Sequence, residues 1–288
     1  MKNKIIYLLG RGRSGSTLFS SILGSQEHFL NVGELKNFHL YYTRSDKMSA
    51  ICMDGIAIKN HPFWKKVIKS FKGKAPNLQS KNIEKFKHNN QKIYDVIFRL
   101  SAKNYIVDSS KKISHLRRLF KTINHDLFTI LMIKDPRNYA LSIIKGNKRK
   151  REHKLLGLYT KIKTKKTSSV FLKLILWNIY YLLILMYFKL TKKKLFILKY
   201  EDLLKNNTKV FEDIYKYIGL ENKNEKIVTE IKPQISFSGN PFFFETTDKK
   251  LNKNLAEIKI SNINWFVYTI LTFPTNLIYN YSLLRGKK

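Results

Sequence analysis

Short apolar runs alternate with longer amphipathic stretches along most of the chain. The apolar runs are rich in Ile, Leu and Val, and their composition and length predict buried β-strands; they are residues 5–9, 105–107, 127–133 and 195–198. Helices are predicted for residues 17–24, 83–102, 114–122, 138–145, 170–190 and 202–218. This alternation predicts an α/β fold, a parallel sheet covered by helices on both faces. Ligands of such sheets bind beyond the carboxyl ends of the strands, so the segments that follow the strands are the first candidates for a site.

The chain of 288 residues is long enough for one sizeable α/β domain, and no stretch of it predicts a linker between independent domains. Residues 59–87 are Lys-rich and predict a basic insertion of helix and loop. Residues 145–169 predict a mobile basic loop, because runs of like charge are usually solvated. Residues 174–188 form the longest apolar stretch. They are fewer than the roughly twenty residues that span a bilayer, so a buried helix is expected, with a membrane-associated segment as the alternative.

The chain carries 55 Lys and Arg against 20 Asp and Glu, a net charge of +35. Because the lysines are spread over the whole sequence, a general bias in composition and an anionic partner both explain this charge. An anionic membrane surface that the protein contacts peripherally is one such partner. Cys52 is the single cysteine, which excludes an intrachain disulfide and fits a reducing compartment. The apolar run at residues 5–9 is too short for a signal peptide, so a cytoplasmic location is expected.

A loop of small and basic residues joins the first predicted strand to the first predicted helix: Gly-Arg-Gly-Arg-Ser-Gly-Ser-Thr at residues 10–17. Small residues let backbone N–H groups approach an anion, and the helix N-terminus adds a favourable dipole. The spacing is that of a Walker A loop, but Ser16 stands where that motif requires Lys. A loop without this Lys is poorly suited to triphosphate chemistry. Arg11 and Arg13 supply charge for a different oxyanion instead.

Residues 13–18 resemble the 5′-phosphosulfate loop of the sulfotransferases that use 3′-phosphoadenosine-5′-phosphosulfate (PAPS). A second segment, residues 134–142, closes a predicted strand and opens a helix, and it resembles the 3′-phosphate motif of the same family. In that motif a basic residue and a Ser eight positions later hold the 3′-phosphate, which corresponds here to Lys134 and Ser142. The family usually has Arg where Lys134 stands. Lys cannot make the bidentate contact of Arg, so Arg137 is a candidate to share this role.

Three further segments resemble the same family. Residues 105–111 resemble a strand that ends in a Lys-bearing turn, and residues 199–203 resemble its Arg-Tyr-Glu-Asp-Leu segment. Residues 238–241 resemble a late motif of bacterial members that closes over the donor, although the Arg that usually follows is absent. The resemblance covers residues 4–240 and implies one sulfotransferase domain over residues 1–288, with the P-loop-like three-layer sheet of that family. It also implies that PAPS is bound by Arg11, Gly12, Arg13, Ser14, Gly15, Ser16, Thr17, Lys134, Ser142, Tyr200, Ser238, Gly239 and Asn240.

The resemblance also implies a general base, which takes the proton of the acceptor hydroxyl. In the tyrosylprotein and related sulfotransferases a Gly-Glu pair carries the base, and the matching Glu34 lies 21 positions after Arg13. Other members of the superfamily use a His, so His39 and His115 are alternatives. A Glu that contacts the dipole at a helix N-terminus is the alternative without a catalytic role.

The implied reaction is the transfer of a sulfuryl group from PAPS to a hydroxyl acceptor, with a glycan or glycolipid expected. Arg13 and Lys111 are expected to stabilise charge on the bridging oxygen, with Lys112 as an alternative to Lys111. Scattered histidines and a single cysteine predict no metal site. Two other classes remain open: a P-loop kinase or NTPase, for which Asp108 is the candidate Mg²⁺ ligand, and a non-enzymatic basic protein that binds an anionic polymer or membrane. A non-enzymatic basic protein would leave the paired phosphate motifs unexplained. Nucleic acid is not an expected partner.

Overall fold

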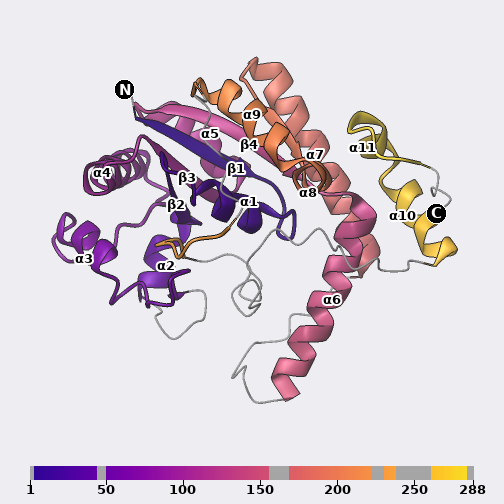
Figure 1. The fold of residues 1–288 in the computed structure, drawn as a ribbon, viewed down its shortest axis with the longest axis horizontal. Helices are drawn as coiled ribbons and strands as arrows, with labels where there is room; N and C mark the ends of the chain where they lie inside the picture. Colours follow the sequence, from indigo (N-terminus) through magenta and orange to yellow (C-terminus); the bar gives the residue numbers. More distant parts are fainter. Residues whose placement is uncertain (1–2, 44–49, 156–168, 222–229, 238–260, 284–288) are drawn as a thin grey trace. The chain divides into compact units, whose positions relative to one another are not determined.

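The fold is described from a computed structural model, which covers residues 3–43, 50–155, 169–221, 230–237 and 261–283 (Figure 1). The side chains of residues 147–155 are not included in this description. The chain divides into two compact units. The first unit consists of Met1–Met132, Lys194–Leu198 and Asp202–Lys253, and the second of Ile133–Lys193, Lys199–Glu201 and Asn254–Lys288. Each unit is described by itself.

The first unit is built on a five-stranded sheet with the strand order β2-β3-β1-β4-β5. The strands are β1 (Lys4–Leu9), β2 (Phe29–Gly33), β3 (Tyr105–Lys111), β4 (Asp126–Ile133) and β5 (Phe196–Lys199). β1 pairs in parallel with β3 and β4, and β2 pairs in parallel with β3. Leu9 lies opposite Lys111 on one side and Leu131 on the other, so these three strands end at the same edge of the sheet. The parallel sheet predicted from the sequence is therefore confirmed, with β2 as an additional strand.

Helices cover both faces of this sheet. In the first unit they are α1 (Ser16–Leu23), the 3-10 turn η1 (Leu35–Asn37), α2 (Phe38–Thr43), α3 (Pro62–Lys69), α4 (Ile83–Ser101), α5 (Ile113–Thr122) and α9 (Asn207–Ile218). Ile6 and Leu8 of β1 belong to the same buried cluster as Phe19 of α1 and Phe211 of α9. Tyr7 of β1, between Ile6 and Leu8, stacks instead on a ring of α5. Because successive strand residues face opposite sides, α5 lies on the face opposite α1 and α9, which confirms the three-layer arrangement.

The second unit is helical, with α6 (Pro136–Leu155), α7 (Val170–Thr191), α10 (Asn262–Leu271) and α11 (Phe273–Ile278). α7 contacts each of the other three helices. α6 continues to Leu155, about ten residues beyond the predicted helix, because this stretch is rich in Lys, Arg and Glu, which are good helix formers. The remainder of the predicted basic loop, residues 156–168, lies outside the described residues.

Two other predicted helices differ from the observed ones. The stretch 202–218 contains two helices, α8 (Tyr200–Lys205) and α9, separated by Asn206, whose side chain accepts the N–H of Lys209 and caps α9. The expectation that α7 is buried is largely wrong. One stripe of the helix is buried, and most of its other apolar side chains are exposed. The sequence of α7 is apolar on both sides of the helix, so it carried no signal of which side is buried.

Candidate active site

The loop of residues 10–17 leaves β1 at the carboxyl edge of the sheet and leads into α1. Gly10 has a φ of 148°, and a Cβ there would lie 2.8 Å from the backbone oxygen of Met132, so a larger residue does not fit. Arg13 and Gly15 also have positive φ angles, 73° and 91°. Left-handed residues in such a turn orient successive N–H groups toward the same side and form an anion-binding concavity. The N-terminus of α1, which begins at Ser16, adds the favourable end of its dipole.

Ser14 is the side chain in this loop that most directly indicates a ligand. It is 1% exposed, and its Oγ has no hydrogen-bond partner among the described residues. A buried hydroxyl without a partner costs roughly 1–3 kcal/mol, so a bound group that accepts or donates a hydrogen bond here would relieve this cost. The turn and this hydroxyl fit the phosphosulfate of PAPS, which the sequence predicts for this loop. Arg11 and Arg13 are half-buried in the same loop.

Glu34 follows β2 directly and is held by side chains of two neighbouring segments. Its Oε1 accepts a hydrogen bond of 2.9 Å from the Nζ of Lys111, at the end of β3. Its Oε2 accepts one of 2.9 Å from the Nδ2 of Asn37, and the Nζ of Lys36 lies 3.7 Å from the same oxygen. The structure thus brings together two residues that the sequence predicts to be catalytic. Lys112, the alternative to Lys111, is exposed at the start of α5.

The surroundings of Glu34 keep it ionised. Burial by itself raises the pKa of this carboxyl, but the positive charges of Lys111 and Lys36 oppose that effect. Together with the hydrogen bonds from Lys111 and Asn37 they bring the pKa of Glu34 below its ordinary value. The group is therefore a carboxylate at neutral pH, able to accept a proton, and its affinity for that proton depends on where Lys111 lies.

A chain of buried hydrogen bonds positions the turn that carries Glu34. The backbone N–H of Lys36 donates to the Oγ of Ser110 over 3.0 Å, and Ser110 Oγ donates to Asp108. Asp108 is fully buried and also accepts from the Oη of Tyr94 at 2.7 Å. Burial raises the pKa of Asp108. With its oxygens engaged in this way, Asp108 acts as a structural residue of β3, which argues against the Mg²⁺ ligand that a kinase would need.

Gly33 explains why the Gly-Glu pair occurs at this point. Its φ is 74°, and a Cβ would lie 2.0 Å from the backbone oxygen of Phe237, which crosses the end of β2. The backbone N–H of Glu34 donates to the same Phe237 oxygen over 3.3 Å. Only glycine permits this close approach. The predicted late motif, Ser238 to Asn240, begins at the next residue but lies outside the described residues, so its role stays a prediction.

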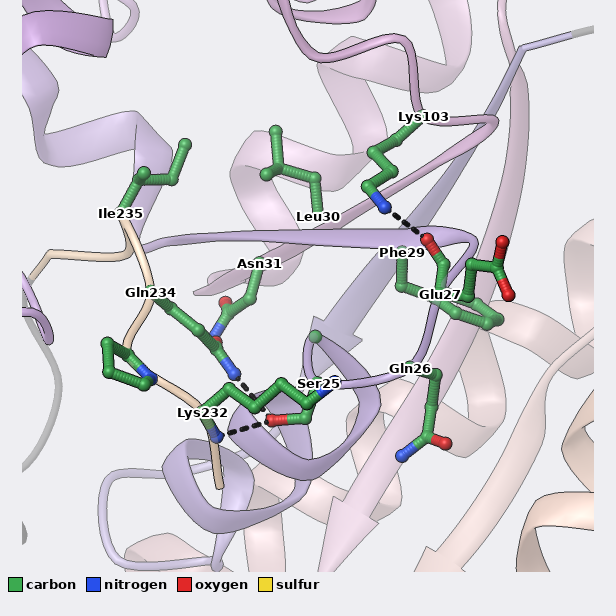
Figure 2. A pocket seen from close by; sticks show the side chains of 12 residues that line it. Ser25, Gln26, Glu27, Phe29, Leu30, Asn31, Lys103, Lys232, Gln234 and Ile235 are labelled. Atoms are coloured by element: carbon green, nitrogen blue, oxygen red, sulfur yellow. Dashed lines mark hydrogen bonds between the residues drawn. The ribbon is translucent and has the colours of Figure 1, made fainter. Parts of the chain in front are cut away.

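The segment that leads to Phe237 is anchored to the first unit by side-chain hydrogen bonds. Figure 2 shows Gln234 next to Ser25 and Asn31. Gln234 Nε2 donates to Ser25 Oγ at 3.0 Å, and Asn31 Nδ2 donates to Gln234 Oε1 at 2.8 Å. The indole N–H of Trp64 donates to the backbone oxygen of Ile235 over 2.8 Å. These contacts fix the position from which the late motif departs.

A cavity of about 600 Å³ lies beside this segment and is lined by residues 24–27, 29–31 and 232–235 and by Lys103 (Figure 2). Its walls include the beginning of β2 and the residue two positions before β3. These walls lie toward the amino edge of the sheet, whereas Glu34 follows the other end of β2. Several polar groups that line it bond to one another, including Lys103 to the backbone oxygen of Glu27. We therefore place the candidate active site at the carboxyl edge and not in this cavity.

The two histidines that were alternatives to Glu34 lie in other environments. His115 is 4% exposed on α5, between Tyr7 and Phe86, and burial lowers its pKa to about 3. A histidine with this pKa is a weak base. His39 is exposed, and its Nδ1 lies 2.9 Å from the backbone oxygen of Ala75. The structure favours Glu34 over both.

In the second unit, Lys134 follows β4 directly and its Nζ lies 4.0 Å from the centre of the Tyr200 ring. Two residues that the sequence predicts to bind the donor are thus in contact. Burial raises the pKa of the Tyr200 hydroxyl, and the adjacent Glu201 raises it further. Ser142 is half-buried on α6. The donor contacts of these residues stay predictions.

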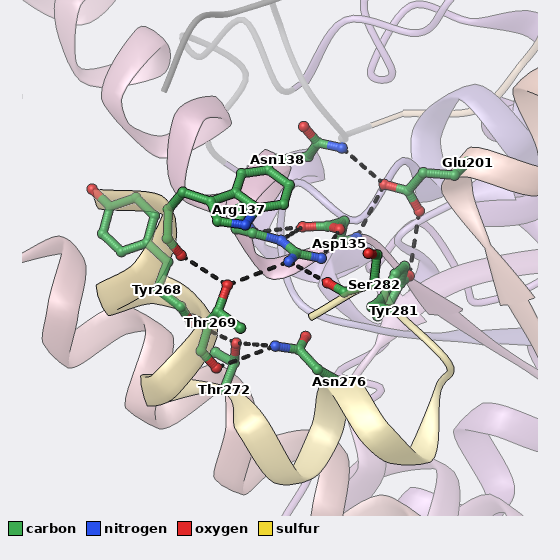
Figure 3. Close-up of polar contacts among 11 residues, drawn as sticks. Asp135, Arg137, Asn138, Glu201, Tyr268, Thr269, Thr272, Asn276, Tyr281 and Ser282 are labelled. Carbon is green, nitrogen blue, oxygen red and sulfur yellow. Dashed lines mark hydrogen bonds and ion pairs between the residues drawn. The ribbon is translucent and has the colours of Figure 1, made fainter. Parts of the chain in front are cut away.

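Arg137 does not share the role of Lys134, because its guanidinium is fully used inside the second unit (Figure 3). The side chain is 1% exposed and forms an ion pair with Asp135. It also donates to Thr269 Oγ1 at 3.3 Å and to the backbone oxygen of Ser282, and it stacks at 4.1 Å on the ring of Trp265. The suggestion that Arg137 assists with the 3′-phosphate is therefore wrong. Sequence could not show this, because Trp265, Thr269 and Ser282 lie more than a hundred residues away along the chain.

Glu201 is a positioning residue that the sequence did not single out. Its Oε1 accepts from the backbone N–H of Asp135 at 3.0 Å and from Asn138 Nδ2 at 3.2 Å (Figure 3). The hydroxyl of Tyr281 lies 3.3 Å from its Oε2. Burial and the charge of Asp135 raise the pKa of Glu201. The only signal in the sequence was its place beside Tyr200.

Cys52, Asp54 and His61 bring their side-chain ligand atoms within 4.8 Å of one another, a group that sequence reasoning did not detect. The two ring nitrogens of His61 already have partners. Nδ1 accepts the N–H of Phe63 at 3.1 Å and so caps α3, and Nε2 lies 2.8 Å from Asp54. Burial raises the pKa of the Cys52 thiol to about 12. These contacts account for the group as a helix cap.

Comparison with known proteins agrees with this geometry. The model of the family described as "Sulfotransferase domain" matches residues 4–255. A sulfotransferase domain from the curacin biosynthetic pathway has a TM-score of 0.60 at 14% identity, with 98% of this chain and 99% of that chain covered. The sulfotransferase domain of the Synechococcus PCC 7002 olefin synthase has a TM-score of 0.56 at 16% identity, covering 99% and 98%.

A sulfotransferase from Mycobacterium avium has a TM-score of 0.51 at 10% identity, with 100% of this chain and 79% of that chain covered. A search of curated proteins finds no match. The structural similarities show the fold, and the family match covers most of the chain, so the predicted resemblance and fold class are confirmed. The chain belongs to the sulfotransferase family and is a transferase enzyme.

Proposed function

We propose that this sulfotransferase transfers a sulfuryl group from PAPS to a hydroxyl of a glycan or glycolipid, with Glu34 as the general base. The observation that carries the proposal is the contact of 2.9 Å between the Glu34 carboxylate and the Lys111 ammonium at the end of two neighbouring strands. Sulfuryl transfer to a hydroxyl requires a group that accepts the proton of the hydroxyl and a cation that stabilises the negative charge on the leaving group. Glu34 and Lys111 lie side by side and supply these two groups. The family match supports the donor, because sulfotransferases generally use PAPS.

In this proposal the loop of residues 10–17 holds the 5′-phosphosulfate through its N–H groups, Ser14 and the two arginines. Lys134 and Ser142 hold the 3′-phosphate, and Tyr200 lies near the nucleotide. Donor binding by this set needs no divalent cation, because Lys and Arg side chains and N–H groups supply the positive charge. The residues that are described fit an anionic donor, and Ser14 supplies a buried hydroxyl without another partner.

Glu34 accepts the acceptor's proton as the new bond forms. The acceptor oxygen attacks sulfur, the bond between sulfur and the bridging oxygen breaks, and its electron pair stays on the phosphate of the leaving adenosine bisphosphate. Lys111 and Arg13 stabilise the charge that develops on that oxygen. When Lys111 turns from Glu34 toward the leaving group, the pKa of Glu34 rises, because the nearest positive charge has left it. One lysine thus links the strength of the base to the presence of the donor.

A transfer assay with labelled PAPS and a panel of glycan, glycolipid and peptide acceptors tests the activity. Thermal unfolding tests the donor independently: adenosine 3′,5′-bisphosphate without Mg²⁺ is expected to raise the melting temperature by mass action. A shift with ATP and Mg²⁺ but none with the bisphosphate would contradict the proposal.

Lys134→Ala separates the two phosphate sites. This variant is expected to weaken binding of adenosine 3′,5′-bisphosphate and to leave binding of adenosine 5′-phosphate nearly unchanged, because the lost contact is specific to the 3′-phosphate. Lys134→Arg is the matched control, which keeps the charge and adds a bidentate donor. Equal losses for both nucleotides would show that Lys134 does not contact the 3′-phosphate.

A further inference from the structure

The helix α7 has two apolar sides. One stripe is buried in the second unit and consists of Leu174, Trp177, Tyr181, Ile184 and Phe188. The other side is exposed and carries Phe171, Leu172, Ile175, Leu176, Ile179, Leu183, Met186 and Leu190. Leu183 and Met186 are each 57% exposed and Leu190 is 78% exposed. An apolar surface this long is unusual on a soluble protein and marks a partner or a membrane.

Two more helices of the same unit add to this surface. α10 exposes Ile263, Phe266 and Ile270, and α11 exposes Phe273, Leu277 and Ile278. Both helices contact α7. The ring of Phe171 at the start of α7 lies 6.1 Å from that of Tyr268 on α10. We call the exposed apolar side chains of α7, α10 and α11 the apolar helical face.

The length and composition of α7 would allow it to cross a membrane. It has 22 residues and a mean hydropathy of 1.8 over its most apolar window, of which 22% is buried. Its inner stripe, however, is fixed to protein. Asn178 is hydrogen-bonded to Thr275 of α11, and Trp177 and Tyr181 pack on the rings of Tyr139 and Tyr279. A helix held along one side by its own unit offers only its other side to lipid, which fits a helix that lies on a bilayer.

The charge of the residues that flank α7 in the sequence indicates the kind of membrane. Residues 145–193 contain fourteen Lys or Arg and a single acidic residue, Glu152. Lys189, Lys192 and Lys193 are exposed at the C-terminal end of α7. Basic residues beside an apolar helix face are the combination that binds anionic lipid surfaces. A second copy of the chain would bring the same positive charge against these lysines, so the charges disfavour a dimer through this face.

We propose that the apolar helical face docks the protein peripherally on an anionic lipid bilayer, with α7 lying in the plane of the interface. The apolar side chains enter the boundary of the acyl chains, and the flanking lysines contact the anionic headgroups. This inference goes beyond the proposed reaction and does not depend on it. If the acceptor is a glycolipid, the same docking places the enzyme on the surface that carries its substrate.

Flotation with vesicles of phosphatidylcholine alone, and with 30% phosphatidylserine added, tests the proposal on the full chain. We expect binding to the anionic vesicles that falls steeply as salt rises. Leu183→Ser with Met186→Ser, and separately Lys189→Gln, Lys192→Gln and Lys193→Gln together, are each expected to reduce the partition coefficient about tenfold or more. Circular dichroism and transfer to a soluble acceptor should be unchanged, since no substituted residue belongs to the candidate active site.

Matched controls come from exposed residues of the first unit. Lys81→Gln, Lys85→Gln and Lys87→Gln remove the same charge, and Ile56→Ser with Ile83→Ser remove comparable exposed apolar surface. These controls should bind vesicles like the unaltered protein. Equal losses of vesicle binding in the variants of the apolar helical face and in these controls would overturn the proposal. Equal binding to vesicles with and without phosphatidylserine would overturn it as well. Resistance to extraction by high salt and alkaline carbonate would show a spanning helix, and a dimer that the Leu183→Ser with Met186→Ser variant dissociates would show a second copy.

Discussion

Replacement of Glu34 by Gln tests the central contact of the candidate active site. Gln keeps the shape of the side chain and its place beside Asn37 but removes the basicity. A positioned general base contributes roughly 10²–10⁴-fold to the rate, which corresponds to about 2.7–5.4 kcal/mol in the activation free energy. We therefore expect kcat to fall by 10²–10⁴-fold, while the affinity for adenosine 3′,5′-bisphosphate stays within about twofold, because in the proposed mechanism Glu34 acts on the acceptor hydroxyl and not on the nucleotide.

The same substitution also has a cost for folding. It leaves the Lys111 ammonium 2.9 Å from an uncharged group. Both side chains are 17% exposed, so water compensates part of the lost attraction. We expect the free energy of unfolding to fall by about 1–3 kcal/mol, less than the 3–5 kcal/mol typical when one partner of a fully buried pair is removed.

Single-turnover transfer of labelled sulfate by the folded fraction, together with denaturant unfolding, separates these two effects. Asn37→Ala is the matched control, because it removes the other 2.9 Å hydrogen bond to Glu34 and leaves the carboxylate in place. We expect this control to lose much less activity than Glu34→Gln. A folded Glu34→Gln protein with full activity would refute the assignment, and so would an equal loss in both variants.

Three further predictions follow from other contacts. The pKa of Glu34 is lowered in the folded state, so the contribution of this carboxylate to stability is complete above the ordinary carboxyl pKa and is lost as pH falls through the lowered value. Lys111→Ala should raise the pKa of Glu34 and move this loss of stability to higher pH. An unchanged pH profile of unfolding would contradict the ion pair. Gly33→Ala should destabilise the protein by roughly 2–4 kcal/mol, because the new Cβ would lie 2.0 Å from a backbone oxygen. Gly55 also has a positive φ, 88°, but a Cβ there would meet nothing within 4 Å, so Gly55→Ala measures the backbone strain alone. Equal losses of stability in the two variants would exclude the steric reason. Ser14→Ala should leave the ligand-free protein equally or more stable, since its buried hydroxyl has no partner among the described residues, and should weaken binding of adenosine 3′,5′-bisphosphate roughly fivefold; lost stability with unchanged affinity would show that the hydroxyl serves the fold instead.

Much of the fold was predictable because it depends on local pattern. A run such as residues 5–9 is apolar at every position, and a short continuous apolar run is typical of a strand that is buried on both faces of a sheet. The loop of residues 10–17 was recognisable because its glycines serve backbone geometry that few other residues permit, and Gly10 and Gly15 have the positive φ angles that this requires. The family assignment rests on these local motifs, so it too was accessible from the sequence.

β2 was missed because its residues do not form a strand by their own pattern. Phe29–Gly33 is short, with Asn31 inside it. It becomes a strand by pairing with β3, where the ring of Phe29 packs at 4.9 Å on that of Tyr105. Strand pairing of this kind joins residues far apart in the chain, and no window of neighbouring residues records it.

The sequence by itself determined the alternation of helices with β1, β3, β4 and β5, the anion-binding loop and the Gly-Glu pair, because each depends on neighbouring residues. Only the tertiary structure decided which charges meet. Lys111 contacts Glu34 across 77 positions, while Arg137, three residues after Lys134, is buried by residues of the C-terminal helices. Only the tertiary structure, too, separated the two sides of α7, because both sides are apolar and only one of them packs on the second unit. Local sequence carries propensity and pattern, whereas the partner of a charge or of an apolar face is set by segments that fold against it from elsewhere in the chain.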